Sequence, residues 1–362
     1  MTDFMTKNRE KLEQFAAMSQ AAGSRSDYVQ GGGGNTSVKL ADGLMAIKAS
    51  GYCLSDIRPD KAYAVLDYEA LRRFYYGNEP AQLADVEKLG SACAKENTKL
   101  IEGMDALRPS VEAGFHSILK TFVCHTHSVY ANLAACSAAC CEIAEQAFTG
   151  ADYTWGWVPY TDPGANLTFA IRDELRRVEE KTGKVPSVIL MQNHGIIVHD
   201  DDAERCLAIH ADANERLAQQ FGIHGDSFPA ISVRQTGEEL YEADTPYLRE
   251  ALKNCRYDYK TFIETPLYPD QMVFLIGTFF MDKEGTPAEG ECYADTKTGA
   301  LVLHMGEKKA KTITETLTAV IFIMDTITKM GYTVSTMGEA AKSFIANWES
   351  EKYRKSLAGK KG

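Results

Sequence analysis

The chain has 362 residues with 39 basic and 50 acidic side chains, a formal net charge of −11. This length favours two domains with a core that needs no disulfide, and the acidic balance argues against a nucleic acid or an anionic membrane as partner. We expect no signal peptide and no membrane-spanning segment, and the odd count of nine cysteines, without a repeated Cys-x-x-Cys, suits free thiols in the cytoplasm.

The first segments predict a helix followed by a glycine-rich turn. Residues 5–22 space their apolar side chains as an amphipathic helix does. Four glycines at 31–34 then allow positive φ values and a close approach to a ligand, and Asn35 and Ser37 add polar side chains before a strand begins. The pattern matches neither a dinucleotide-binding motif nor a Walker A loop, so an anion site and a plain surface turn both remain open.

A second polar turn follows the next predicted strand. Residues 45–49 predict a strand that ends at Ser50 and Gly51, where a hydroxyl and backbone amides are offered to an anion. Two such turns after neighbouring hairpin strands would lie side by side at one end of a sheet. Lys39 and Lys48 stand on these strands, and we expect them to face solvent. The next predicted elements are a strand with a short helix at 61–76 and a charged helix at 82–100.

The stretch 108–119 predicts a helix whose start carries a carboxylate. Pro109, Ser110 as a cap and Glu112 in the first turn are typical of a helix start. Glu112 is then either an acid favoured by the helix dipole or a catalytic acid/base. We expect His116, one turn later, to pack or to form hydrogen bonds rather than to bind a metal.

Two histidines follow the next strand at a spacing of two. The apolar run 122–124 is typical of a buried strand, and His125 and His127 come directly after it. Side chains two apart on an extended backbone point to the same face, so the two imidazoles are placed to share one metal ion. The alternative is that one histidine caps the helix predicted over 129–147 and the other is a solvated loop residue.

A third histidine interrupts a pair of apolar strands. Residues 185–191 and 196–198 predict buried strands, with Asn193, His194 and Gly195 between them. Buried polar groups need hydrogen-bond or ligand partners, and we expect Gly195 to let the backbone turn so that His194 points inward. The helices expected around this pair span residues 166–182 and 202–221.

A change of composition near residues 222–229 predicts a boundary between domains at 1–225 and 226–362. The second part predicts a smaller α/β domain of unknown role, without a cluster of catalytic residue types. Its predicted elements are a helix at 236–254, strands at 272–277 and 301–304, a further strand or hairpin at 285–299, a helix at 311–330 and a C-terminal helix with a basic tail.

In this order, the two polar turns, the helix-start acid, the His-x-His and the Asn-His-Gly resemble the class II aldolase/adducin family over about residues 8–222. The glycine run, the Lys-Ala-Ser-Gly turn and the second domain are most similar to the aldolase half of rhamnulose-phosphate aldolase/dehydrogenase proteins, and fuculose-phosphate aldolase belongs to the same group. The resemblance implies a three-layer α/β/α domain with a mostly antiparallel central sheet. It also implies a homotetramer with sites at subunit boundaries.

The resemblance assigns roles to the motif residues. It implies that His125, His127 and His194 bind Zn²⁺ and leave positions open for substrate, and that Glu112 is the general acid/base. The phosphate-binding residues that it implies are Gly34, Asn35, Ser37, Ser50, Gly51 and Ser110.

Two further positions bear on the substrate. The family places a tyrosine from a neighbouring subunit at the aldehyde end, for which Tyr153 and Tyr160 are the candidates. The family commonly has two hydroxyl residues before the acid, but Val111 occupies the second position here. This departure weakens the assignment of the anion as a phosphate.

The activity implied is zinc-dependent cleavage of a (deoxy)ketose 1-phosphate, such as rhamnulose or fuculose 1-phosphate, to dihydroxyacetone phosphate and an aldehyde through a metal-bound enediolate. Glu112 would move the proton on the enediolate carbon, with a pKa raised by partial burial. The same site would suit a sugar-phosphate epimerase or a 3-oxo acid phosphate decarboxylase. A third hypothesis is a non-catalytic scaffold similar to the adducin head, against which retention of the three histidines and Glu112 argues.

Overall fold

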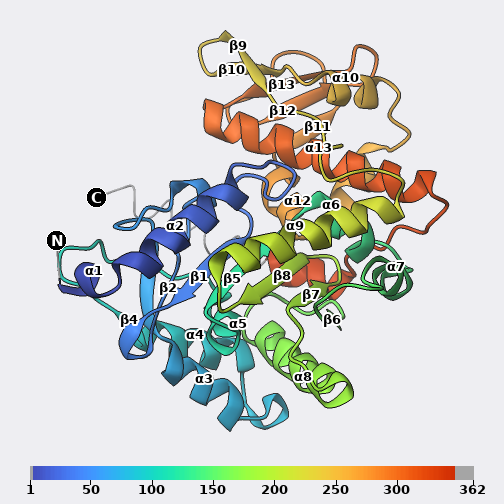
Figure 1. Ribbon diagram of the computed structural model, residues 1–362. Coiled ribbons are helices and arrows are strands. Elements are labelled where there is room, and N and C mark those ends of the chain that lie inside the picture. Colours follow the sequence, from blue (N-terminus) through green and yellow to red (C-terminus); the bar gives the residue numbers. More distant parts are fainter. Residues whose placement is uncertain (1–2, 347–362) are drawn as a thin grey trace.

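The computed structural model describes residues 3–346, which form two sheets with helices around them (Figure 1). Within these residues the larger sheet has eight strands in the order β4-β3-β2-β1-β5-β8-β7-β6. They are β1 (Asn35–Lys39), β2 (Leu44–Lys48), β3 (Tyr63–Asp67), β4 (Thr98–Lys99), β5 (Phe122–Thr126), β6 (Trp155–Val158), β7 (Val188–Met191) and β8 (Gly195–Asp200). The β6–β7 pair is parallel and its neighbours along this sheet pair antiparallel, which confirms the predicted mostly antiparallel sheet.

The strands are apolar on both faces, so helices cover both. In β5, Phe122 and Cys124 belong to one buried apolar cluster, whereas Val123 belongs to another on the opposite face. Because successive side chains of a strand alternate between faces, each face needs its own cover. Figure 1 shows α2 and α9 on one side of this sheet and α3 and α8 on the other, the predicted three-layer arrangement. The helices are α1 (Asp3–Lys7), α2 (Arg9–Gly23), α3 (Tyr68–Gly77), α4 (Val86–Glu96), α5 (Ala113–Ile118), α6 (Val129–Ala135), α7 (Cys140–Ala147), α8 (Ala165–Thr182) and α9 (Ala203–Gln220).

The C-terminal part contains the second sheet, which has five strands in the described residues, in the order β11-β12-β13-β10-β9. These are β9 (Val233–Gly237), β10 (Leu240–Ala243), β11 (Phe279–Met281), β12 (Cys292–Asp295) and β13 (Ala300–His304). The helices of this part are α10 (Pro246–Lys253), α11 (Tyr259–Glu264), α12 (Pro269–Leu275) and α13 (Glu307–Lys329). The predicted smaller α/β unit is confirmed, and the boundary between residues 225 and 226 stays a prediction.

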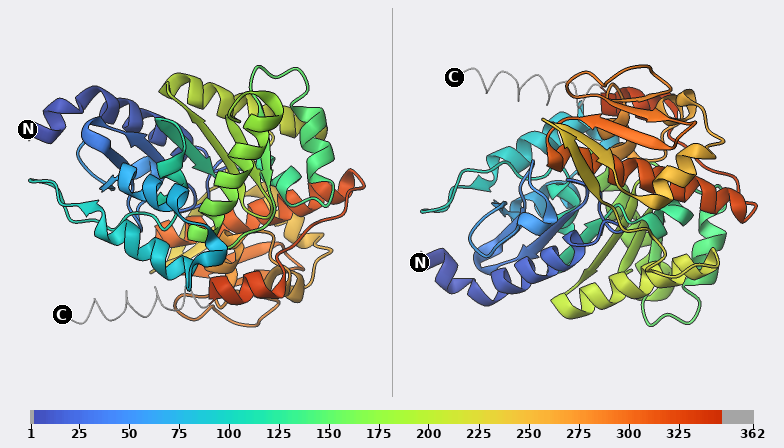
Figure 2. Two further views of the ribbon diagram at one scale, coloured as in Figure 1. Left: turned by 90° about the horizontal axis from the view of Figure 1, so that it is seen from below. Right: turned by 90° about the horizontal axis from the view of Figure 1, so that it is seen from above.

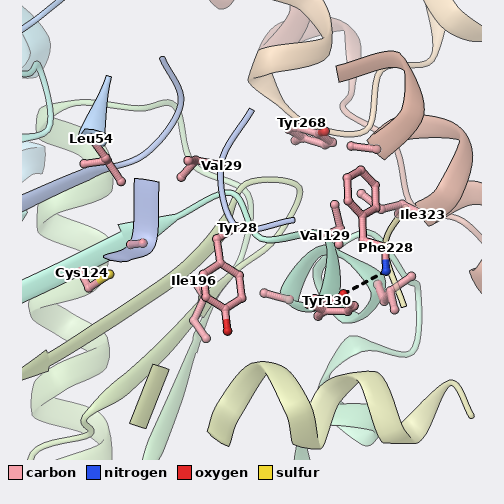
Figure 3. Packing of buried hydrophobic residues seen from close by; sticks show 14 of the residues in the cluster. Tyr28, Val29, Leu54, Cys124, Val129, Tyr130, Ile196, Phe228, Tyr268 and Ile323 are labelled. Carbon is pink, nitrogen blue, oxygen red and sulfur yellow. Dashed lines mark hydrogen bonds between the residues drawn. The ribbon is translucent and has the colours of Figure 1, made fainter. Parts of the chain in front are cut away.

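One apolar cluster runs through both parts of the chain (Figure 3). It contains Val129 and Tyr130 of α6 together with Phe228 and Ile323, and α13 packs against α6. The hydroxyl of Tyr130 accepts a hydrogen bond from the backbone N–H of Phe228 at 3.1 Å. Figure 2 shows the C-terminal elements lying against the first sheet and its helices along one side. The C-terminal part is therefore packed onto α6, directly behind the His-x-His strand.

Three predicted elements differ from the structure. The helix expected at 236–254 is instead the β9–β10 hairpin followed by α10, which starts at Pro246. The strand expected at 272–277 is helix α12, whose buried Met272 and Leu275 are three residues apart, a helical rather than an extended spacing. The helix expected at 129–147 is two helices, α6 and α7. The backbone between them leaves the helical pattern, because the N–H of Ala138 donates to the carbonyl of Thr333 instead.

Other predicted elements agree with the structure. The long helix at 311–330 corresponds to α13 and the strand at 301–304 to β13. The predicted basic tail lies beyond residue 346, outside the described residues. Among the residues that are described, no helix is long and apolar enough to cross a bilayer.

Candidate metal centre

The structure brings His125, His127 and His194 together at one end of the large sheet. Each offers a nitrogen within 4.8 Å of those of the other two. The ring centroids form a nearly equilateral triangle with sides of 5.0, 5.1 and 5.1 Å. The three side chains are buried, with relative exposures of 0, 6 and 3%. The alternative that one histidine of the His-x-His is a solvated loop residue is therefore wrong.

His194 is aimed inward by its neighbours on both sides. Asn193 has the positive φ of 51°, a conformation that asparagine tolerates better than most residues. Gly195, which we expected to make the turn, is needed for a different reason. A Cβ at this position would lie 2.3 Å from the carbonyl oxygen of Thr126, so only glycine lets β8 pass this close to β5.

Hydrogen bonds fix which nitrogen of His125 and His127 is free. Nδ1 of His125 donates to the carbonyl of Ile196 at 3.0 Å, and Nδ1 of His127 donates to Asp270 at 2.6 Å. In neutral rings the two Nε2 atoms carry lone pairs, and they face each other at 3.2 Å. Such lone pairs repel, whereas two nitrogens bound to one tetrahedral Zn²⁺ at about 2.0–2.1 Å stand roughly 3.3 Å apart. The donor set therefore fits a metal ion.

The pKa of His125 favours metal binding, whereas the pKa of His127 lets a proton compete with the metal ion for the ring. Burial lowers the pKa of His125 well below its ordinary value, which keeps the ring in the neutral form that binds metals. Burial also acts to lower the pKa of His127, but Asp270 outweighs it and raises this pKa. Nδ1 of His194 is buried and has no hydrogen-bond partner among the described residues.

Glu112 lies beside the triad at the N-cap position of α5. Its Oε1 is 3.2 Å from Nε2 of His194 and its Oε2 is 3.7 Å from Nε2 of His125. Burial alone would raise the pKa of the Glu112 carboxyl, but the three neighbouring imidazoles lower it well below its ordinary value. The expectation of a raised pKa is therefore wrong, because the charge and hydrogen bonding of the neighbouring imidazoles outweigh desolvation.

A chain of hydrogen bonds from the first glycine-rich turn holds Glu112. Nδ2 of Asn35 donates to Oε2 of Glu112 at 2.5 Å, and Oδ1 of Asn35 bonds to Nε2 of His116. On the other side of that ring, Nδ1 of His116 is 2.7 Å from the hydroxyl of Ser37. Burial lowers the pKa of His116 to about 3, so the ring is neutral. The prediction that His116 forms hydrogen bonds rather than binding the metal agrees with this geometry.

The predicted phosphate residues divide into an enclosed and an exposed group. Asn35 and Ser37 are buried at 3 and 0% exposure, and their side chains bond to protein partners. Gly34 has φ of 65° and packs on the His125 carbonyl. Ser50 and Gly51 are exposed, and the half-buried Ser110 accepts a hydrogen bond from Asn35 at 3.2 Å.

Lys39 and Lys48 are buried, so the expectation that they face solvent is wrong. Nζ of Lys39 donates to backbone carbonyls at the end of α5, including that of His116 at 3.0 Å. Nζ of Lys48 donates to the carbonyls of Gly32 and Tyr52 at 3.1 and 2.8 Å, which ties the two polar turns together. Burial lowers the pKa of Lys48 to about 8. The two turns therefore do lie side by side, over a buried lysine.

Asp270 and Lys48 are the site residues that sequence reasoning missed. Asp270 stands in the first turn of α12, where an acid has an ordinary structural explanation, and 143 residues separate it from His127. Lys48 follows four apolar or small residues of an ordinary strand. Neither position carries a local signal, because the meaning of each depends on a distant segment that folds against it.

Two cavities adjoin the site without including the triad. One of about 780 Å³ is lined by Ser110 and Val111 among others. Another of about 330 Å³ lies beside Gly51, and its lining includes the cations Arg58, Lys61 and Lys308. Both open next to residues predicted to hold the anion rather than at the histidines.

The two tyrosine candidates have different surroundings. The hydroxyl of Tyr153 donates to Asp212 at 2.8 Å, on the side of α9. The backbone N–H of Tyr160 donates to Gln192 at 3.1 Å, which places Tyr160 next to the loop that carries His194.

The family model described as Class II Aldolase and Adducin N-terminal domain matches residues 13–221. The chain belongs to this family. The predicted resemblance over residues 8–222 is confirmed, and the class II aldolase domain contains the histidine triad and Glu112, whereas Asp270 lies outside the match. A search of curated proteins found no match.

Several solved structures are similar to this class II aldolase domain. One is the N-terminal class II aldolase domain of a Thermoplasma acidophilum protein, 20% identical, with a TM-score of 0.46 over 57% of this chain and 92% of that chain. Another is YgbL of Klebsiella pneumoniae, described as "a putative aldolase/epimerase/decarboxylase", 18% identical, with a TM-score of 0.40 over 60% of this chain and 91% of that chain. A third is L-fuculose-1-phosphate aldolase of Thermus thermophilus, 13% identical, with a TM-score of 0.34 over 58% and 93%.

Proposed function

We propose that the protein is a zinc-dependent aldolase that cleaves a (deoxy)ketose 1-phosphate, such as rhamnulose or fuculose 1-phosphate, to dihydroxyacetone phosphate and an aldehyde. The observation that carries this proposal is the pair of Nε2 atoms of His125 and His127 facing each other at 3.2 Å, with His194 completing a buried triad. Three imidazole nitrogens are a donor set that suits a catalytic zinc ion with open positions. The ion, when bound, supplies positive charge that stabilises the negative charge left on the substrate as the C3–C4 bond breaks.

Glu112 is the residue that moves the proton on the substrate carbon. Its lowered pKa keeps the carboxyl ionised near neutral pH, so it is ready to act as a base in the direction of aldol addition and returns the proton in cleavage. Asn35 holds one carboxylate oxygen at 2.5 Å, and His116 and Ser37 hold Asn35 in turn. The carboxylate is thereby oriented before substrate arrives, which is a large part of what a positioned acid/base supplies.

We propose that the substrate's phosphate lies at the two polar turns. Ser50, Gly51 and Ser110 are accessible there and offer hydroxyls and amides. Gly34, Asn35 and Ser37 belong to the same proposed group, with the side chains of Asn35 and Ser37 acting on Glu112 and His116. The buried ammonium of Lys48 beneath both turns adds the positive charge that neutral donors lack.

The proposal extends to a homotetramer, as the family resemblance implied, with Tyr153 or Tyr160 reaching the aldehyde end of a neighbouring site. It also extends to a location in the cytoplasm, which the free thiols suit. Val111 is exposed and stands where relatives have a hydroxyl residue, which favours a second candidate reaction at the same site. Weaker phosphate binding at this position suits a substrate that also carries a carboxylate, as that of a 3-oxo acid phosphate decarboxylase does. A sugar-phosphate epimerase is the other alternative on this site.

A product screen tests the proposal. Zinc-loaded protein is incubated with rhamnulose 1-phosphate and fuculose 1-phosphate, and dihydroxyacetone phosphate is measured by coupled reduction to glycerol 3-phosphate. We expect release from at least one ketose, abolished by a chelator and restored by zinc. A C4 epimer without cleavage, or carbon dioxide from a 3-oxo acid phosphate, would instead select the second candidate.

A further inference from the structure

The C-terminal part holds each of the three loops that build the metal centre. The backbone N–H of Gly31, in the glycine run, donates to Glu315 of α13 at 3.0 Å. Nδ1 of His127 donates to Asp270 of α12 at 2.6 Å. Nδ2 of Asn193, next to His194, donates to the carbonyls of Leu267 and Ser335, at 2.8 Å each. These partners lie outside the matched family domain, which ends at residue 221.

The contact between Asp270 and His127 is buried. Asp270 and His127 are each 6% exposed, and the buried Tyr268 lies on the same segment, with its ring centroid 6.4 Å from that of His127. The glycine run closes over the pair. A Cβ on Gly33 would lie 2.5 Å from Oδ2 of Asp270 and 3.0 Å from Nδ1 of His127, so a larger residue cannot take this place without moving them. A charge-assisted hydrogen bond shielded from water in this way is strong.

The three histidines differ in the hydrogen-bond partner of their Nδ1 atoms. Asp270 gives His127 a carboxylate, and Ile196 gives His125 a neutral carbonyl. His194 has no partner for its Nδ1 in the described part of the chain. A carboxylate behind a metal-binding imidazole fixes the tautomer and the ring orientation and makes the other nitrogen a better donor. His127 is therefore the ligand whose binding strength depends on a distant segment.

We propose that Asp270 is the positioning residue for His127, so that the described C-terminal part completes a metal centre whose ligands all lie in the first domain. This inference rests on the proposed function, because it requires a metal ion on His127. It gives the C-terminal part a role in the site, through one carboxylate, as well as a role in stability.

Metal affinity in matched variants tests this inference. The variants are Asp270→Asn, which keeps the shape and a hydrogen-bond acceptor without the charge, and Asp270→Ala, which removes both. The control is Gln271→Ala, because Gln271 is the next residue of α12, is fully buried and bonds only within the C-terminal part, to Leu267 and Phe262. The zinc dissociation constant is measured in the full chain by competition with a chromophoric chelator, and the visible absorption spectrum is recorded after cobalt substitution.

We expect the zinc dissociation constant to rise about 10–100-fold in Asp270→Ala, the usual cost of losing such a partner, and less in Asp270→Asn. The cobalt spectrum should change in both, whereas Gln271→Ala should keep wild-type affinity and spectrum even if its melting temperature falls. Wild-type affinity and spectrum in both Asp270 variants would overturn the inference, as would an equal loss in Gln271→Ala. If Asp270→Ala does not fold, Asp270→Asn decides alone. A wild type that binds no zinc would instead contradict the proposed function and the inference with it.

Discussion

Glu112→Gln separates chemistry from metal binding. Glutamine has the shape of glutamate, and its carbonyl can keep the 2.5 Å hydrogen bond from Asn35. Its amide group then points toward His194, where the carboxylate oxygen now lies 3.2 Å from Nε2. The substitution removes the charge, the acceptor that faces Nε2 of His194 and the ability to exchange a proton, and it keeps nearly the same side-chain volume.

The expected loss is therefore in turnover. A positioned acid/base contributes about 10²–10⁴-fold, so kcat should fall by that factor, equivalent to roughly 3–5 kcal/mol in activation free energy. Stability should change by only about 1 kcal/mol, the net contribution of one hydrogen bond. Steady-state kinetics on the ketose phosphate, zinc content per chain by elemental analysis and a thermal denaturation curve measure the three quantities.

Glu174→Gln is the matched control. Glu174 is also buried, at 8% exposure, and accepts a 2.7 Å hydrogen bond from the backbone of Trp157, away from the histidines. Its variant should keep wild-type turnover per bound zinc. Glu112→Gln with normal turnover per bound zinc, or with loss of the zinc itself, would refute the assigned role and make Glu112 a structural residue or a ligand.

Three further predictions concern the anion turns and the sheet. Val111→Ser should lower KM for a phosphorylated ketose by the equivalent of about 0.5–1.5 kcal/mol, with little change in kcat, because the phosphate is held alike in the ground and transition states. Steady-state kinetics that show no lower KM would count against a phosphate at this position. For Lys48, whose pKa is about 8, kcat/KM for a phosphorylated ketose should fall as pH rises above about 8, and Lys48→Arg should lack this limb, whereas an unchanged pH profile in the variant would exclude the lysine. Because the folded-state pKa lies below the ordinary 10.5, the unfolded chain binds more protons between these values, so this lysine makes stability rise with pH across that window. Lys39→Met leaves buried carbonyls of His116 and its neighbours without a hydrogen-bond donor. The variant should lose about 1–3 kcal/mol of stability per carbonyl in a thermal melt and keep its zinc content. A melt like that of the wild type would show that those carbonyls find other partners.

Local patterns were sufficient for much of the first domain. The apolar run before His125 alternates between two cores, and the long helices α8 and α9 carry sustained helical spacing, so periodicity alone predicts them. The same holds for α13 in the C-terminal part. The triad was predictable for a related reason. His-x-His after a strand and Asn-His-Gly between apolar strands each need partners, and adjacent antiparallel strands β5 and β8 bring the two motifs together.

The remaining features depend on contacts between distant segments. Lys48 looked like a solvent-facing strand residue, but its ammonium bonds to carbonyls of two turns that fold over it. Asp270 was not singled out in the sequence, and residues 272–277 just after it were predicted as a strand because so short an apolar run has no clear period. The role that we propose for the C-terminal part depends on the contact between Asp270 and His127, which no pattern within that part predicts.

The zinc content of the histidine variants tests the central claim most directly. Wild-type protein and His125→Ala, His127→Ala and His194→Ala are purified alike and analysed for metal, with His199→Gln as control, because His199 is buried at 1% exposure in the same sheet but outside the triad. The account predicts stoichiometric zinc in the wild type and the control, and loss of tightly bound zinc in each of the other three. Stoichiometric zinc in all three alanine variants would contradict it.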